Sequence, residues 1–204
     1  VSDPANSAAP EMPAAVEENL APDAEPGKIT ITIEPAQTTY VDARFPNQQF
    51  SGAGELQVAT IVSNTNYPIW SLVKFSNMSR IPSGSQIYRA HIDLYQAHVS
   101  GGNINIQPYS LQSAWSSAIT YNAARGLRMT PFGGAVGVGT GRGWSSFDVS
   151  GLINNWWKNP SSNNGMLYYG STGGVHFFSN SRNDKEPSLR IELRCDFYAP
   201  TASI

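Results

Sequence analysis

The apolar residues of segment 143–157 change their spacing halfway along, and this change constrains the fold more than any other feature of the chain. Residues 144–149 are rich in aromatic and β-branched side chains without helical spacing, which predicts a strand. From Val149 onward, the apolar positions 149, 152, 153, 156 and 157 follow one face of a helix. We therefore predict a strand that runs directly into a two-turn helix.

The predicted helix is too short to be stable alone, so its apolar face must pack against the rest of the protein. Asp148 or Ser150 can cap its first turn by accepting hydrogen bonds from free N–H groups, and Asn159-Pro160 ends it. We expect the helix to close the open end of an apolar core, with its tryptophans Trp156 and Trp157 lying on that core.

Short strand patterns separated by turns fill most of the remaining chain. Residues 28–34 alternate strictly, and Gly101-Gly102 predicts a hairpin between residues 86–95 and 104–107. We also predict a hairpin formed by residues 165–170 and 175–179. The chain has 18 glycines, 14 prolines and 14% charged residues, a composition typical of an extracellular all-β domain. We predict an all-β fold, a β-sandwich or jelly roll of about ten short strands with one short helix.

The first 27 residues differ in composition from the rest of the chain. They form an extended arm rich in Pro and Ala with six acidic and no basic side chains, whereas residues 28–204 hold 13 basic and nine acidic residues. Such an arm cannot bury enough apolar surface to fold by itself. It is either a solvated tail or a segment that lies on a basic body, its own or that of a neighbouring copy. Residues 28–204 form the predicted sandwich domain.

Other features bear on the compartment. Val1 in place of a start methionine indicates processing, and we expect an extracellular or cell-surface protein. No apolar run approaches the ~20 residues that span a bilayer. The single cysteine, Cys195, cannot form an internal disulfide bond. Its neighbours Leu193 and Phe197 favour a buried thiol over an intermolecular link.

Several motifs between about residues 29 and 195 occur in the order typical of a known family. They are the loop at 46–52, the strand at 71–76, the stretch at 81–95, the stretch at 144–157 and the closing strand at 187–191. In this order they resemble the DNRLRE family of secreted β-sandwich domains, related to alginate-type carbohydrate-binding modules. The resemblance implies a secreted sandwich that performs no chemistry. The matched positions are mostly core and turn residues, so they indicate the fold rather than the ligand.

We find no arrangement of residues that points to catalysis. His91, His98 and His176 belong to no His-Glu-x-x-His motif, and the glycine run at 137–143 is not followed by the Gly-Lys-Ser/Thr of a phosphate-binding loop. We therefore expect no enzyme and no cofactor. Structural calcium is the one exception that we consider. Its candidate ligands are Asp42, Asp184 and Glu186.

Aromatic side chains give the best indication of a ligand. A pyranose ring has an apolar C–H face that packs on flat aromatic rings, and an anionic sugar also needs Arg or Lys. The candidate sugar-binding residues are Trp70, Tyr67, Trp157, Tyr168, Tyr169, Arg89 and Arg128. We expect Trp115, Trp144 and Trp156 to lie in the core instead.

Two functions remain open at this stage. The first is a subunit of a cell-surface filament or matrix, in which the arm of one copy docks on a sheet edge of the next. The alternative is a carbohydrate-binding module that recognises an anionic polysaccharide, for example as an adhesin. The expected partners are therefore other copies of the chain or a polysaccharide, and we expect neither a nucleic acid partner nor a membrane span.

Overall fold

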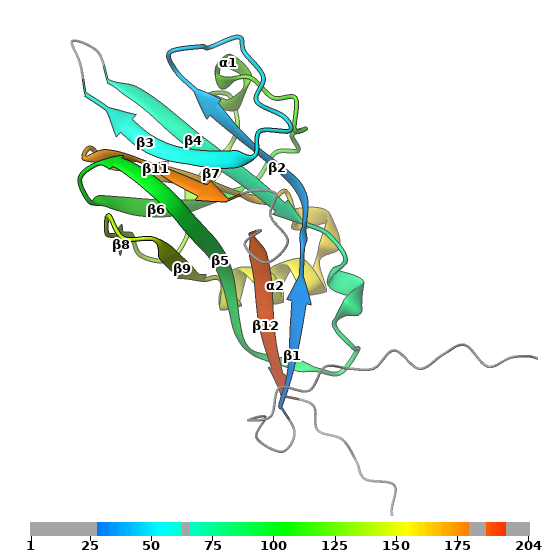
Figure 1. The fold of residues 1–204 in the computed structure, drawn as a ribbon. Coiled ribbons are helices and arrows are strands. Elements are labelled where there is room, and N and C mark those ends of the chain that lie inside the picture. The colour runs from blue at the N-terminus through cyan, green and yellow to red at the C-terminus, as the bar shows by residue number, and fades with distance from the viewer. Residues whose placement is uncertain (1–27, 63–65, 180–186, 195–204) are drawn as a thin grey trace, which may run out of the picture.

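The computed structural model describes residues 28–62, 66–179 and 187–194, which form an all-β fold of twelve strands in two antiparallel layers (Figure 1). Sheet A contains β1 (Lys28–Ile33), β5 (Gln86–Gly101), β9 (Gly143–Asp148), β11 (Gly174–Ser179) and β12 (Ser188–Arg194). Sheet B contains β2 (Pro35–Asp42), β4 (Tyr67–Phe75), β6 (Ile104–Leu111), β7 (Met129–Pro131), β8 (Val136–Val138) and β10 (Met166–Gly170). β3 (Glu55–Ile61) joins the layers, because its first half pairs with β11 and its second half with β4.

The predicted fold class is confirmed, and the additional strands have a simple origin. β7 and β8 are three residues each and lie in the glycine-rich connection 126–143, where no apolar alternation marks a strand. The structure also contains a second short helix, α1 (Tyr121–Ala124), and two 3₁₀ turns, η1 (Met78–Arg80) and η2 (Pro160–Ser162). None of the helices in the described ranges has the length and hydropathy needed to cross a bilayer.

Helix α2 (Ser150–Lys158) closes one end of the core, as its spacing predicts. Leu152, Ile153 and Trp156 are buried in the main apolar cluster between the two sheets. The N-cap residue of the helix is Val149, whose side chain offers no acceptor, and the preceding Asp148 supplies one instead: its Oδ1 accepts a hydrogen bond of 2.9 Å from the backbone N–H of Ser150. Hydrogen bonds from Ser150 lower the pKa of the Asp148 carboxyl, and this favours the ionised acceptor at the start of the helix.

Both predicted hairpins are wrong. Residues 86–95 and 104–107 do not pair, because β5 pairs with β9, β11 and β12 in sheet A and β6 with β7, β8 and β10 in sheet B. Residues 165–170 and 175–179 do not pair either. β10 pairs with β4 and β6 in sheet B, whereas β11 pairs with β3 and β5 in sheet A. The chain therefore crosses between layers at residues 171–173. Gly173 permits this crossing, because a Cβ there would lie 2.2 Å from the carbonyl oxygen of Asn103. Residues 171–173 therefore do not form a tight hairpin turn. They pack closely against the turn between β5 and β6 instead.

The outer face of sheet B is covered by the segment 112–128, which includes α1. Ile119 and Ala124 from this segment pack on Trp70, Leu72 and Leu167 of the sheet and form a second buried cluster. Trp115 is half-buried against the same cluster, and its Nε1–H donates to the carbonyl oxygen of Asn164 at 2.7 Å. The sequence expectation of a core position for Trp115 is met only in part.

Two buried polar side chains anchor the glycine-rich segment to sheet A. The Gln96 amide donates to the carbonyl oxygens of Gly139 and Gly141, and the His176 ring lies against the same amide. His176 Nε2 lies 3.0 Å from the carbonyl oxygen of Gly102, and its Nδ1 faces the Gln96 side-chain oxygen, so both ring nitrogens are in contact with oxygen atoms. Burial lowers the pKa of the His176 imidazole below its ordinary value of 6.5.

Some predictions concern residues outside the described ranges. They are the arm at 1–27, the calcium candidates Asp184 and Glu186, and the state of Cys195. These stay predictions.

Replacing Ile153 with Ala tests the role of α2 in closing the core. The side chain is fully buried in the main cluster, so we expect the free energy of unfolding to fall by about 2–5 kcal/mol. Lys158→Ala, at an exposed position of the same helix, is the control and should change it by less than about 0.5 kcal/mol. Urea unfolding followed by fluorescence measures both. Equal effects of the two substitutions would contradict burial of the helix face.

Protonation of His176 should destabilise the fold. Because its folded-state pKa is lowered, the unfolded chain gains a proton below about pH 6.5 that the folded chain resists, so stability falls as the pH drops through that value. Urea unfolding between about pH 8 and about pH 5.5 should show a smaller acid-induced loss in His176→Gln than in the unmodified protein. An identical pH dependence in both would show that His176 does not titrate differently on folding.

Candidate functional site

The outer face of sheet A presents a row of side chains from three neighbouring strands. In an antiparallel pair, residues directly opposite each other point to the same face. Ile92 lies opposite Phe147 and Leu189, and all three are buried in the core. The residues between them therefore face outward. This outer strip consists of Arg89, His91, Asp93 and Tyr95 of β5, Trp144 and Ser146 of β9, and Ser188, Arg190 and Glu192 of β12.

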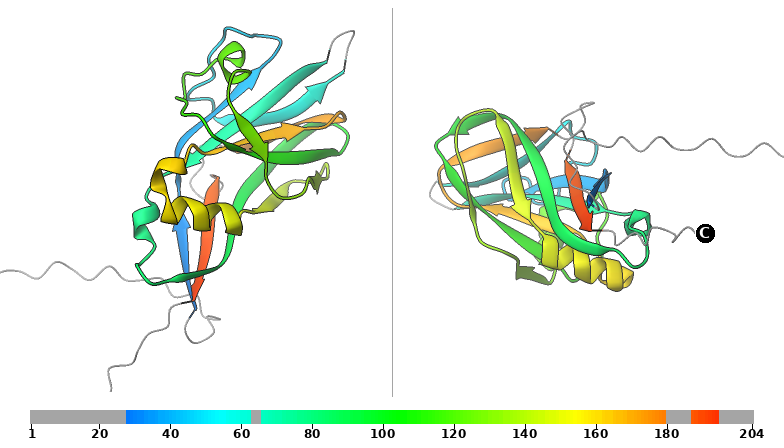
Figure 2. Two further views of the ribbon diagram at one scale, coloured as in Figure 1. Left: turned by 180° about the vertical axis from the view of Figure 1, so that it is seen from behind. Right: turned by 90° about the horizontal axis from the view of Figure 1, so that it is seen from below.

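No helix packs over this strip within the described ranges. α2 belongs to the core on the inner side of sheet A. It lies behind β1 and β12 in Figure 1 and in front of them in the reverse view of Figure 2, left. The outer face of sheet A is therefore open, in contrast to the covered outer face of sheet B.

Trp144 and Tyr95 form an aromatic pair at one end of the strip. Their ring centroids are 5.3 Å apart and the rings meet edge to face at 73°. Trp144 is 51% exposed, so the expectation of a core position was wrong. The reason is the strand period: Trp144 precedes the core residue Phe147 by three positions, which places the two on opposite faces. An open indole edge-on to a second ring offers an apolar surface for the C–H face of a pyranose.

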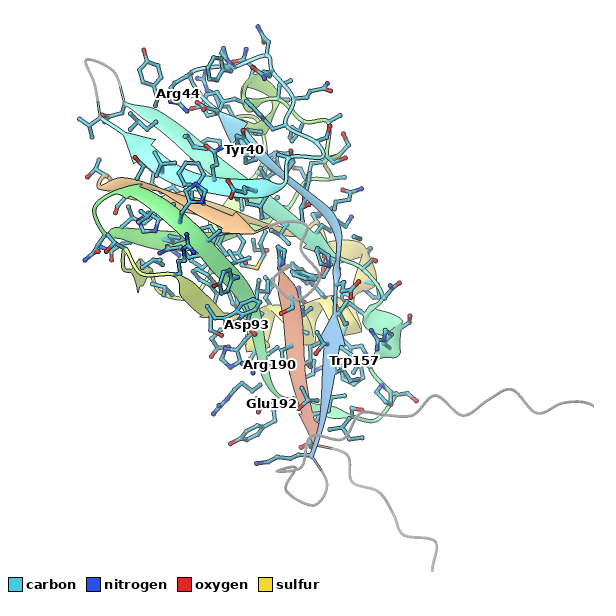
Figure 3. The ribbon with its side chains drawn as sticks, viewed as in Figure 1. Tyr40, Arg44, Asp93, Trp157, Arg190 and Glu192 are labelled. Atoms are coloured by element: carbon cyan, nitrogen blue, oxygen red, sulfur yellow. The ribbon has the colours of Figure 1, made fainter. Side chains whose placement is uncertain are left out.

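The middle of the strip is polar and carries both charge signs. Asp93 accepts a hydrogen bond from the Ser146 hydroxyl, and its Oδ2 lies 3.6 Å from Arg190 Nε. Glu192 lies opposite Arg89 in the strand register. Figure 3 shows Asp93, Arg190 and Glu192 close together along β5 and β12. Sugar hydroxyls both donate and accept hydrogen bonds. A surface that carries both carboxylates and guanidinium groups can therefore bind them, and it needs no net charge to do so.

Tyr88 extends the exposed aromatic surface at the beginning of β5. Its ring is 55% exposed, and both the Lys28 ammonium and the Arg89 guanidinium lie near it, at 5.0 and 5.6 Å from the ring centroid. Arg89, a candidate from the sequence, thus lies on the same face as Trp144. Cations near the ring hold it at this end of the strip.

The other aromatic candidates do not join the strip. Trp70 and Tyr169 are neighbours, with ring centroids 6.4 Å apart, but Trp70 is buried under Tyr121 and the segment 112–128. Tyr168 is fully buried in the main core, where burial raises the pKa of its hydroxyl, so its proposed place in a sugar platform was wrong. Strand alternation explains this too, because Tyr168 faces the core and Tyr169 the outer face of sheet B.

The remaining candidates occupy separate places. Tyr67 is half-buried at the start of β4, and Arg128 is exposed between α1 and β7. Trp157 is half-buried at the end of α2 and lines a hollow beside η1. None of these three side chains comes from the strands that form the outer strip.

Asp42 is engaged by an arginine in this structure. Its carboxylate accepts bonds from Arg44 Nε at 3.0 Å and Nη2 at 2.6 Å and from the Arg44 backbone N–H at 2.8 Å. Within residues 28–62, 66–179 and 187–194, no group of three or more His, Cys, Asp or Glu is placed to hold a metal ion. With Asp184 and Glu186 outside these ranges, structural calcium stays a prediction.

Comparison with known proteins places the chain in a known family. The sequence profile of carbohydrate-binding module family 96 matches residues 29–193, which include every described strand except the first residue of β1 and the last residue of β12. No match was found among the curated proteins. The resemblance seen in the sequence is therefore supported at the level of a carbohydrate-binding module family.

Quenching of tryptophan fluorescence tests the exposure of Trp144. Its indole is the most exposed of the described tryptophans, so Trp144→Phe should remove the largest part of the emission that acrylamide quenches readily. Trp156→Phe, at a fully buried position, is the control and should leave that part unchanged. We expect Trp144→Phe to alter the free energy of unfolding by less than about 1 kcal/mol, because the position is on the surface. A buried quenching signature for Trp144 would contradict the open strip.

Proposed function

Because the chain belongs to carbohydrate-binding module family 96, a family of non-catalytic binding modules, we propose that it binds a polysaccharide across the outer strip of sheet A. One observation carries this proposal: the open Trp144 indole stands beside Tyr95 at the end of an uncovered polar face. Tryptophan and tyrosine are enriched at binding surfaces, and aromatic rings contribute much of the binding energy when a ligand buries them.

In the proposed complex, one pyranose ring stacks on the indole of Trp144. The next sugar units follow the polar row away from it, so that their hydroxyl groups meet Asp93, Arg190 and His91. The Ser146 hydroxyl and the Arg190 guanidinium already hold the Asp93 carboxylate in place, and this reduces the entropy lost on binding. The ring face supplies affinity, and the polar row selects the orientation of the hydroxyl groups.

The proposal includes an extracellular or cell-surface location, because that is where a protein would encounter a polysaccharide of a cell surface or matrix. Assembly into a filament has no comparable support. It depends on residues 1–27, which lie outside the described ranges, and it stays a prediction from the sequence.

Substitution of Trp144 tests the proposed function. We expect Trp144→Ala to weaken binding to a soluble hexuronate polymer at least about tenfold in affinity electrophoresis, because the stacking surface is lost. Arg190→Ala should weaken it as well, by removing a hydrogen-bond donor from the polar row.

Phe45→Ala is the matched control. Phe45 is 49% exposed but lies in the loop after β2, against Phe50. Its removal should leave the mobility shift unchanged. The proposal fails if Trp144→Ala binds as well as the unmodified protein, or if Phe45→Ala loses as much affinity.

A further inference from the structure

We infer that the chain has a second sugar subsite, selective for an anionic sugar unit, in the hollow between the end of β4, η1 and the C-terminal end of α2. This inference rests on the proposed function and adds to it a second site with a preference for negative charge. The hollow has a volume of about 480 Å³, within the range of small-ligand sites. Its walls carry Lys74, Ser76, Asn77, Ser79, Trp157 and Asn163, above a floor of Phe75 and Met78.

Trp157 supplies the apolar wall. It packs against the main core and also lines the hollow, and it is half-buried. The packing holds the indole in one orientation, so little rotamer freedom remains to be lost when a ligand arrives. Pro160, exposed at the start of η2, continues the same wall. Together they offer a rigid surface to the C–H face of one pyranose ring.

Lys74 supplies the charge that selects an acidic sugar. It is the only charged side chain in the lining, and no carboxylate of the described residues forms an ion pair with it. Lys74 is half-buried as a residue and lines a concave surface, so its ammonium, without a carboxylate partner, is available to an anion that enters the hollow. The outer strip differs in this respect, since Asp93 there already lies near Arg190.

Polar groups surround Lys74 in a pattern suited to hydroxyls. Ser76, Asn77 and Ser79 line one side, and the Asn163 amide is held in place by donating to the carbonyl oxygen of Phe75 at 2.7 Å. Asn77 has φ 64° and ψ 31°, the left-handed conformation, and its carbonyl oxygen accepts from the Arg80 backbone N–H at 3.0 Å. No other non-glycine residue of the described ranges has a positive φ. Glycine adopts this conformation freely, so Asn77→Gly removes the amide without straining the backbone.

The hollow and the outer strip lie on different sides of sheet A. Trp157 comes from α2, which packs on the inner side, whereas Trp144 and Arg190 point outward. The ribbon shows α2 behind β1 and β12 in the view of Figure 1 and in front of them in the reverse view of Figure 2. One module can therefore hold two chains, or two segments of one chain, of an acidic polysaccharide. Two linked sites raise the apparent affinity for a polymer far above that of either site alone.

Calorimetric titration with two matched probes tests the inference. The probes are a hexuronate tetrasaccharide and the neutral tetrasaccharide made from it by carboxyl reduction. We expect two sites per chain for the acidic probe and one for the neutral probe, because only the hollow depends on the carboxylate. Lys74→Gln should weaken the second site about tenfold or more through loss of its charge-assisted hydrogen bond, and Asn77→Gly should weaken it too. The outer strip should remain unaffected by both substitutions.

Control variants separate the possible outcomes. Lys158→Gln removes an exposed lysine adjacent to Trp157 that does not line the hollow, and it should leave both sites intact. Trp144→Ala should abolish the neutral-probe site and retain the acidic one. A single acidic site that Trp144→Ala removes and Lys74→Gln leaves unchanged would overturn the second subsite but not the proposed function. Failure of the unmodified protein to bind either probe would overturn both.

Discussion

The attachment of α2 to β5 determines where the functional side chains lie. The backbone N–H of Val149 donates to the carbonyl oxygen of Ala90 at 2.9 Å, and the backbone N–H of Ala90 donates to the Ser150 hydroxyl at 2.9 Å. These bonds fix the register of β9 on β5 just before the helix begins, while the buried face of α2 prevents the strand from sliding. A shift of one residue would turn every β9 side chain to the opposite face. The position of Trp144 beside Tyr95 is thus a consequence of how the core is closed.

One outer face of the sandwich is covered and the other is open, because the first is apolar and the second is polar. The outer face of sheet B carries Leu72, Leu167 and Trp70, and burying them requires a cover, which the segment 112–128 provides. The outer face of sheet A carries charged and hydroxyl side chains, whose burial would cost free energy without partners. It therefore stays open, and the one large apolar side chain that it exposes beside Tyr95 is Trp144. An open polar surface with exposed aromatic rings is suited to a solvated sugar chain.

The sequence predicts the elements of this fold better than the neighbours of each side chain. The helical spacing from residue 149 is a local signal and is confirmed. The glycine pair at 101–102 is also a local signal, but the hairpin predicted from it is wrong, because β5 and β6 lie in different sheets and do not pair. The exposure of Trp144 could also have been predicted from the sequence, because two residues three positions apart in a strand point to opposite faces and Phe147 faces the core. The burial of Trp70 could not have been predicted, because the segment 112–128 that covers it has no periodic pattern that reveals where it packs. The crossing at Gly173 likewise depends on contact with Asn103, which is 70 positions away in the sequence.

The charges of the outer strip and of the hollow differ, and this difference suggests that the two sites recognise different features of a polysaccharide. On the outer strip, Arg190 and Arg89 lie near or opposite acidic side chains, so an incoming carboxylate must compete with Asp93 or Glu192, and hydroxyl groups are bound as readily as anions. In the hollow, Lys74 meets no such competitor among the described residues, so its ammonium gains most from an anionic ligand. Stacking on Trp144 can then provide much of the affinity for a polysaccharide chain, while Lys74 and Trp157 discriminate the acidic unit from its neutral analogue. Specificity is a difference between two affinities. When the neutral sugar binds, Lys74 is left without an anionic partner, and this lowers the affinity for the neutral sugar relative to the acidic one.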